Sequence, residues 1–130
     1  MGKRILVILG HPAEESLCGA VAKTYVKGAQ AAGHEIRLLS LGKLQFDPIL
    51  HDGYNTIQPL EPDLVAAQDS IVWAEHLVFV YPIWWGSIPA ILKGFFDRIL
   101  LPGFAFKFQK GALMADGLLA SRTAHLIATM

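Results

Sequence analysis

The chain begins with a short, uninterrupted run of branched apolar residues, Ile-Leu-Val-Ile-Leu, which follows Lys3 and Arg4 and is closed by Gly10. A strand with one wet face alternates apolar and polar residues, whereas a strand covered on both faces is apolar throughout. Strands of the second kind occur mainly in parallel sheets that carry helices on both sides. Residues 3–9 are therefore predicted to form a central strand of an α/β domain.

A helical pattern follows this strand. From Leu17 to Ala29, apolar residues recur at every fourth position, which places them on one helix face. Ser16 stands where a helix N-cap is expected, and Gly33 stands where the helix should end. A helix is predicted over residues 16–32.

The remaining pattern continues the alternation of strands and helices. Strands are predicted at 34–41, 74–81 and 123–130, helices at 64–73 and 88–101, and a long surface excursion at 42–62. This β-α-β-α-β-α-β order predicts parallel strands joined by right-handed crossovers in a three-layer α/β sandwich. The sequence stops at Met130 inside an apolar strand, so we expect that a last strand and helix are missing or that a partner covers the edge.

Length and charge limit the function classes. A chain of 130 residues suits a single domain spanning 1–130. Its 11 basic and 11 acidic residues cancel, and only 17% of residues are charged, so no basic field exists to attract nucleic acid or an anionic membrane. No stretch reaches the roughly 18 uninterrupted apolar residues of a spanning helix, and membrane insertion is not expected.

Hydrophobic content and cysteine usage add two expectations. With 53% hydrophobic residues and a mean hydropathy of +0.41, the chain should contain a buried parallel sheet, apolar surface used for assembly, or both. Cys18 is the only cysteine, so neither an internal disulfide nor a cysteine metal site is expected. A reducing, cytoplasmic location is predicted.

The first strand-to-helix turn, residues 10–17, can bind an anion. The start of a helix offers unpaired N–H groups and about half a positive charge. Neither a Walker pattern nor G-x-G-x-x-G is present, which leaves a flavin-type or simpler anion site. Ser16 can serve there or act only as a cap, His11 can contact a ligand or be satisfied by the turn backbone, and Glu14 and Glu15 are expected to face solvent.

The turn after the third predicted strand suits a planar ring. Pro82 stiffens the turn, Gly86 allows positive φ or close approach, and the intervening N–H groups can meet a ligand. Trp84 and Trp85 are too apolar to stand together in water, so at least one should stack on a bound ring or pack in the core. Further along, the aromatic stretch 101–108 can line a flat substrate, contact a subunit neighbour, or form a packed loop.

Two blocks carry a family resemblance. Gly10-His11-Pro12 with Ser16-Leu17, and Tyr81-Pro82 through Asp97-Arg98 with Gly103-Phe104-Ala105-Phe106, resemble the NAD(P)H quinone oxidoreductase family of flavodoxin-like flavoproteins. The similarity spans essentially the whole chain. Its specific part is Pro-x-x-Trp followed by Pro-Ala-x-Leu-Lys-Gly-x-x-Asp-Arg.

The resemblance implies a flavodoxin-like three-layer sandwich with sheet order 2-1-3-4-5, a bound FAD or FMN at the carboxyl edge, and hydride transfer from NAD(P)H to quinones or similar two-electron acceptors. Residues implied to contact the flavin phosphate and ribityl chain are His11, Ser16, Leu17 and Cys18. Residues implied to contact its isoalloxazine ring are Pro82, Ile83, Trp84, Trp85 and Gly86. Those implied to face the substrate are Trp85, Phe106 and Phe108.

Departures from the family pattern modify these expectations. Many relatives have tyrosine at positions 106 and 108 and asparagine at position 18, so the phenylalanines and Cys18 favour apolar acceptors. In the family, the Tyr and His that assist flavin reduction follow the fourth strand, beyond Met130. No residue of this chain is therefore assigned a catalytic role, and no metal is expected.

The enzyme is expected to be a homodimer with the third helix and the aromatic stretch at its interface, because such a dimer would hide surplus apolar surface. Three other classes of protein are alternatives to this enzyme. An ancillary flavoprotein that regulates a potassium efflux system would need a protein partner. An electron-transfer flavodoxin is usually strongly acidic, unlike this neutral chain, and a phosphoacceptor receiver domain would have carboxylates after its first and third strands.

Overall fold

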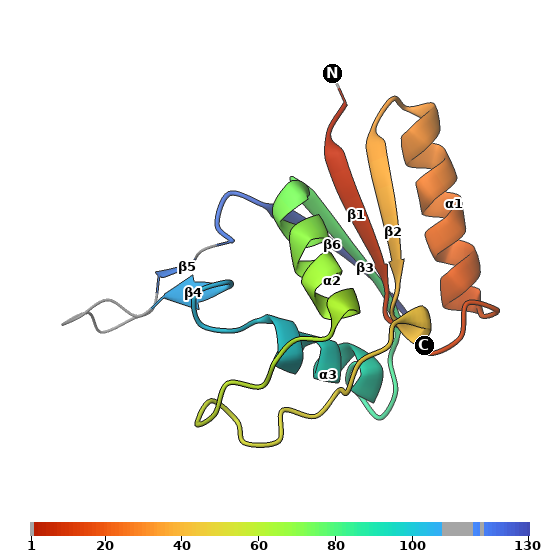
Figure 1. Cartoon of the computed structure of the whole chain (residues 1–130). Helices are drawn as coiled ribbons and strands as arrows, with labels where there is room; N and C mark the ends of the chain where they lie inside the picture. The colour runs from red at the N-terminus through yellow and green to blue at the C-terminus, as the bar shows by residue number, and fades with distance from the viewer. Residues whose placement is uncertain (1, 108–115, 118) are drawn as a thin grey trace.

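The computed structural model describes residues 2–107, 116–117 and 119–130. A parallel four-stranded sheet of order β2-β1-β3-β6 forms its centre (Figure 1). In chain order the elements are β1 (Arg4–Leu9), α1 (Leu17–Ala31), β2 (Glu35–Ser40), the 3-10 helix η1 (Leu41–Lys43), α2 (Pro62–Trp73), β3 (His76–Pro82), α3 (Ala90–Ile99), β4 (Phe106–Lys107), β5 (Asp116–Gly117) and β6 (Thr123–Thr129). The predicted α/β class, the strand order and the parallel pairing are confirmed.

The sheet is the middle of three layers, with α1 on one face and α2 and α3 on the other (Figure 1). Successive residues of β1 point to opposite faces, so Leu6 and Ile8 pack with α2 and α3 while Val7 and Leu9 pack with α1. Residues 5–9 are all buried. Each fully buried Leu, Ile or Val contributes about 1.5–3 kcal/mol, which explains why the strand is apolar throughout.

Element ends differ from the predictions by one or two residues, for local reasons. The helix predicted at 88–101 is α3, Ala90–Ile99, because Pro89 stays extended at φ −64° and ψ 155° and the residue before a proline avoids helical geometry. The strand predicted at 74–81 begins at His76, because the Ala74 N–H still bonds to the Ser70 and Ile71 carbonyls at the end of α2.

The 42–62 segment is a surface excursion, as predicted, but a buried arginine fixes it to α3. Arg98 is 1% exposed and donates to the Glu61 carboxylate at 2.7 Å, to the Pro59 carbonyl at 3.0 Å and to the Asp47 carbonyl. A buried guanidinium is stable only when its hydrogen bonds and charge are matched. The excursion supplies partners for Nη1 and Nη2 and a matching charge, while the buried Nε has no partner among the described residues, so the path of the excursion over α3 is set by Arg98.

This pair gives a pH prediction. Hydrogen bonding from Arg98 lowers the pKa of Glu61 below its ordinary value. A carboxyl with a lowered folded-state pKa adds stability above its unfolded-state pKa, and that stability is lost as pH falls through the folded-state value. Glu61→Gln should therefore have a flatter stability curve than the wild type below about pH 4.3, measured by urea unfolding at a series of pH values. Parallel curves would contradict this.

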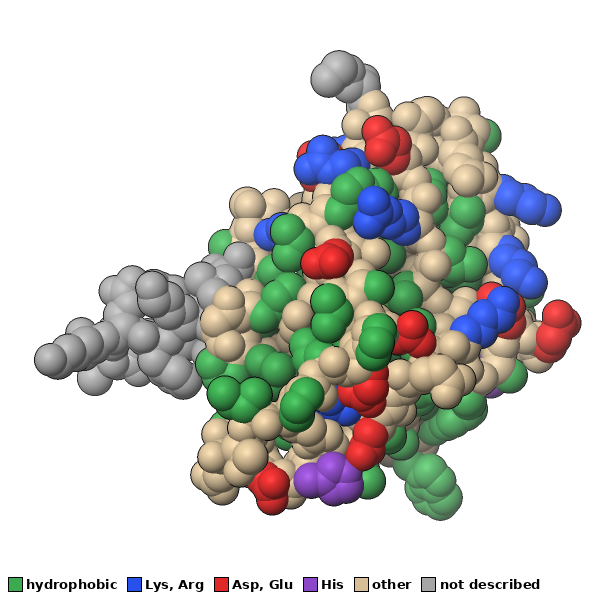
Figure 2. Space-filling model, viewed as in Figure 1, with side chains coloured by type: hydrophobic (Ala, Val, Ile, Leu, Met, Phe, Trp, Pro, Cys, Tyr) green, Lys and Arg blue, Asp and Glu red, His purple; other side chains and the backbone are tan. Residues whose placement is uncertain are grey.

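Apolar side chains gather on the excursion. Ile49, Tyr54 and Ile57 are 57%, 66% and 93% exposed, and a hollow of about 340 Å³ lies between residues 50–58 and Leu101-Pro102. Figure 2 shows hydrophobic side chains over this lower part of the molecule. The buried parallel sheet is confirmed and apolar side chains are exposed, while the use of this surface for assembly stays a prediction.

The aromatic stretch is placed only in part. Phe104 packs against the α2–α3 side of the core, and Phe106 begins the two-stranded β4–β5 ribbon, which was not predicted. Phe108 lies outside the described residues. Within the parts of the chain that the structure describes, no helix has the length and apolar character needed to cross a bilayer.

Candidate functional site

The two turns singled out from the sequence lie next to each other at the carboxyl edge of the sheet. They follow β1 and β3, which are neighbouring parallel strands, and the Gly10 N–H donates to the Val80 carbonyl at 2.8 Å. The His11 ring meets the Trp84 ring edge-on, with centroids 5.4 Å apart and an interplanar angle of 70°. Residues 10–16, here called the anion loop, and residues 84–87, here called the Trp turn, therefore form one site.

The anion loop ends in a capped helix. The Ser16 hydroxyl accepts the Gly19 N–H at 3.1 Å and donates to the Ala13 carbonyl at 2.8 Å, which confirms the predicted cap. The first-turn N–H groups of Leu17 and Cys18 have no acceptor within the helix. They are left at the positive end of the α1 dipole, where an anion is favoured.

His11 has a defined tautomer when neutral. Its Nδ1 accepts the Ala13 N–H at 2.9 Å, so the proton of the neutral ring is on Nε2. The turn backbone thus satisfies one ring nitrogen, which agrees with the interpretation of His11 as a histidine bonded to its own turn. The other nitrogen keeps a donor, and the ring joins the anion loop to the Trp turn.

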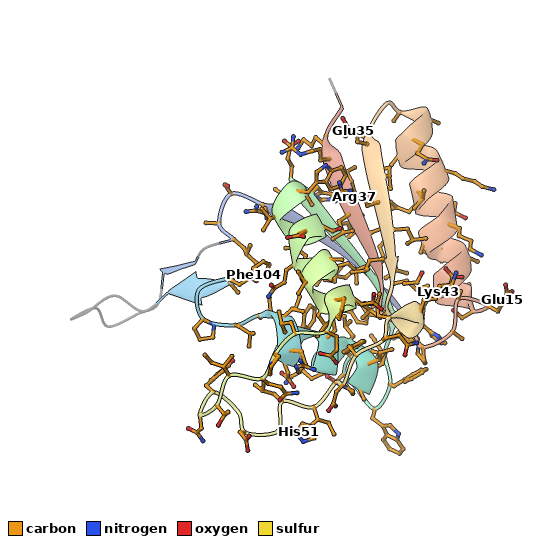
Figure 3. The ribbon with its side chains drawn as sticks, in the orientation of Figure 1. Glu15, Glu35, Arg37, Lys43, His51 and Phe104 are labelled. Carbon is orange, nitrogen blue, oxygen red and sulfur yellow. The ribbon has the colours of Figure 1, made fainter. Side chains whose placement is uncertain are left out.

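Of the two acids in the loop, only Glu15 is exposed as expected. The interpretation was wrong for Glu14, whose carboxylate accepts the Ser40 hydroxyl at 2.8 Å and pairs with the Lys43 ammonium at 2.8 Å. The hydrogen bond from Lys43, followed by that from Ser40, lowers the pKa of Glu14. Figure 3 shows Lys43 and Glu15 at this end of the molecule.

The Trp turn has an unusual backbone. Trp84 and Ser87 exchange both backbone hydrogen bonds, at 2.9 and 3.2 Å, and Trp85 and Gly86 between them have φ of +53° and +72°. These values are those of a type I′ turn, which favours Asn and Gly and in which tryptophan is rare. The turn presents the Trp85 indole fully to solvent, at 103% exposure, while Trp84 is 45% exposed.

Fewer backbone donors are free in this segment than the sequence suggested. The Trp84 N–H is used within the turn, and the Ile83 N–H donates to the Thr129 carbonyl at 2.7 Å. Among the described residues, the Trp85 and Gly86 N–H groups have no acceptor. These two N–H groups are therefore the backbone donors of the Trp turn that a polar ring edge could bind.

Thr129 was missed by the sequence interpretation. Besides holding Ile83, its hydroxyl lies 3.2 Å from the Cys18 sulfur, which joins the end of β6 to the first turn of α1. Cys18 is 2% exposed and its sulfur lies against the Thr129 hydroxyl, so the thiol is not presented to a ligand at this edge. Leu17, 67% exposed, gives the rim an apolar side chain.

The residues present fit a phosphate-bearing planar ligand. The loop offers free first-turn N–H groups, and the Trp turn offers two further N–H groups beside an exposed indole. In residues 2–107, 116–117 and 119–130, no group of three or more His, Cys, Asp or Glu side chains could hold a metal ion.

Comparison with known proteins agrees with this geometry. The family model described as "Flavodoxin-like fold" matches residues 3–130. The chain belongs to this family. Among solved structures, the flavodoxin-like chain resembles NAD(P)H:quinone oxidoreductase from Methanothermobacter marburgensis, with a TM-score of 0.78, 25% identity, and 98% of this chain and 66% of that one covered.

An FMN-dependent NADH-azoreductase from Bacillus anthracis in complex with FMN has the same fold, with a TM-score of 0.67, 21% identity, and 96% and 68% of the two chains covered. Among curated proteins, NAD(P)H dehydrogenase [quinone] 1 of Cavia porcellus is 32% identical over 126 residues, covering 82% of this chain. An uncharacterized NAD(P)H oxidoreductase of Haemophilus influenzae is 36% identical over 112 residues, also covering 82%. The flavodoxin-like chain spans 46% and 54% of the length of these two relatives, about half.

Proposed function

We propose that this chain is the flavin-binding domain of an NAD(P)H-dependent oxidoreductase that reduces quinones or similar two-electron acceptors through FAD or FMN. The observation that carries the proposal is the contact between the anion loop and the Trp turn, which puts an anion site and a ring site side by side. The names of the relatives, quinone dehydrogenase and NAD(P)H oxidoreductase, support the same class of reaction.

In this proposal each part of the site binds one part of the flavin. The N–H groups of Leu17 and Cys18 hold the phosphate, and the Ser16 cap keeps the helix start in place. The N–H groups of Trp85 and Gly86 meet the polar edge of the ring, while the indole excludes water from it. The flavin supplies the hydride chemistry, and the protein supplies position and fixed dipoles.

We further propose that the acceptor is apolar and that the enzyme is a cytoplasmic homodimer. Ile83, Trp84 and Leu17 surround the site with apolar surface. Figure 3 places Phe104, which belongs to the aromatic stretch, far from Glu15 and Lys43 at the site. A second copy would let this stretch reach a site and would cover the apolar hollow of the excursion.

The first test is an absorbance spectrum of the purified chain, with and without FMN or FAD, followed by anaerobic addition of NADH and NADPH. Bound flavin that is bleached by a nicotinamide would support the proposal. Failure to retain either flavin would contradict it for this chain.

Ser16→Asp separates capping from phosphate binding. Aspartate caps a helix as well as serine does, so the free energy of unfolding should stay within about 0.5 kcal/mol of the wild type. Its negative charge beside the N–H groups of Leu17 and Cys18 should weaken FMN binding about tenfold, measured by quenching of flavin fluorescence. Ser16→Asn is the matched control, because asparagine caps without charge and should bind FMN nearly as the wild type does. Equal affinity of both variants would place the phosphate elsewhere.

A further inference from the structure

An acidic residue beside an anion site needs an explanation. Glu14 lies two residues before the N-cap Ser16 of the helix whose N-terminus forms the site. A carboxylate so placed repels a phosphate unless its charge is matched and it is directed away from the site. In the structure its charge is matched and it is held toward β2 and η1, because the Glu14 carboxylate binds the Ser40 hydroxyl and the Lys43 ammonium, each at 2.8 Å.

These partners come from a different part of the chain. Ser40 ends β2 and Lys43 ends η1, whereas Glu14 belongs to the turn after β1. The Ser40 residue is 8% exposed, and the Glu14 and Lys43 side chains are 24% and 69% exposed. The carboxylate is thus held by one buried group, the hydroxyl at the end of β2, and by one largely exposed group, the ammonium at the end of η1.

Two glycines bring the backbones together around this contact. Gly42 of η1 lies against the Pro12 carbonyl, and Gly19 of α1 lies against the Glu14 carbonyl, each so closely that a Cβ atom would not fit. The Glu14 carbonyl also accepts the Ser16 N–H at 2.9 Å. A shift of the Glu14 backbone would therefore displace the N-cap residue Ser16.

We propose that Glu14, Ser40 and Lys43 form a latch that holds the anion loop in its anion-binding conformation, so that Glu14 raises flavin affinity despite its negative charge. Glu14 is a positioning residue, because it acts through the loop backbone and the Ser16 cap. The identity of the ligand as a flavin rests on the proposed function, while the action of the latch on the loop does not.

A double-mutant cycle separates the latch from simple electrostatics. If Glu14 and Lys43 act only as charges, Glu14→Ala tightens FMN binding, Lys43→Met weakens it, and the two effects add. If they form a latch, each substitution breaks the same contact. Each single substitution should then weaken FMN and FAD binding about threefold to tenfold. The double variant should have a flavin affinity no lower than that of the single variant with the lower affinity.

Glu15→Ala is the matched control. It removes the same charge one residue further along, from an exposed side chain for which the described residues provide no hydrogen bond or ion pair. It should leave FMN affinity unchanged or slightly tighter. Tighter binding by Glu14→Ala, or additive effects in the cycle, would overturn the latch.

Hydrogen exchange without any flavin keeps the two proposals distinguishable. Loss of the latch should speed exchange of the Ala13 and Ser16 amides in Glu14→Ala and in Lys43→Met, but not in Glu15→Ala. If the wild type binds neither flavin, but the Ala13 and Ser16 amides exchange faster in Glu14→Ala and Lys43→Met than in the wild type, the proposed function fails and the latch stands. If flavin binds but exchange in both variants equals that of the wild type, the latch fails and the proposed function stands.

Discussion

Glu61→Ala should lower the free energy of unfolding by about 3 kcal/mol, because it leaves a buried guanidinium without its counter-charge. Arg98 is 1% exposed, and the Glu61 carboxylate is its closest acidic partner, at 2.7 Å. The carbonyls of Asp47 and Pro59 would keep their hydrogen bonds but provide no charge. Urea unfolding followed by tryptophan fluorescence measures the change.

Asp97→Ala is the control for this prediction, since it removes a carboxylate from the neighbouring position on α3. The Asp97 pair with Lys93 is also short, at 2.6 Å, but both side chains are largely in water, at 41% and 62% exposure. An exposed pair of this kind contributes about 0.3–0.5 kcal/mol. If both variants lost the same free energy of unfolding, the burial of Arg98 would not make its ion pair more stabilising than an exposed pair.

The contrast between Arg98 and β1 shows which part of the fold the sequence could predict. β1 is recognisable because a short run of five branched apolar residues closed by Gly10 is typical of a strand covered on both faces. Arg98 finds its partners 37 and 51 positions away, in a segment with no periodic pattern. The excursion could therefore be predicted to exist, but its anchoring to α3 required the tertiary structure.

The same distinction applies to the site. Ser16 was predictable as a cap, since capping is a local interaction that depends on residue type. Thr129 and Lys43 have no such signal, because each contacts the site from a strand or a 3-10 helix that is brought there only by the sheet order β2-β1-β3-β6. Glu14 was placed in solvent by the sequence interpretation for the same reason.

Trp85→Ala should weaken FMN binding by about 1–3 kcal/mol, which is the usual loss when a stacked or packed aromatic side chain is truncated. The indole is fully exposed in the free chain, so its removal should change the free energy of unfolding by less than about 0.5 kcal/mol. Flavin fluorescence quenching and urea unfolding measure the two quantities. Val72→Ala, which truncates another exposed apolar side chain, at 55% on α2, is the control and should change neither.

Trp85→Gly tests why a tryptophan occupies a position whose backbone conformation favours glycine. At φ +53° a tryptophan backbone is disfavoured by about 1 kcal/mol or more, and glycine adopts this conformation freely. The variant should therefore be at least as stable as Trp85→Ala while losing as much FMN affinity. That result would mean that the turn tolerates strain in order to present an indole to a ligand. Unchanged FMN binding in both variants would remove the ring-contacting role of Trp85, and the strained turn would then need a different explanation.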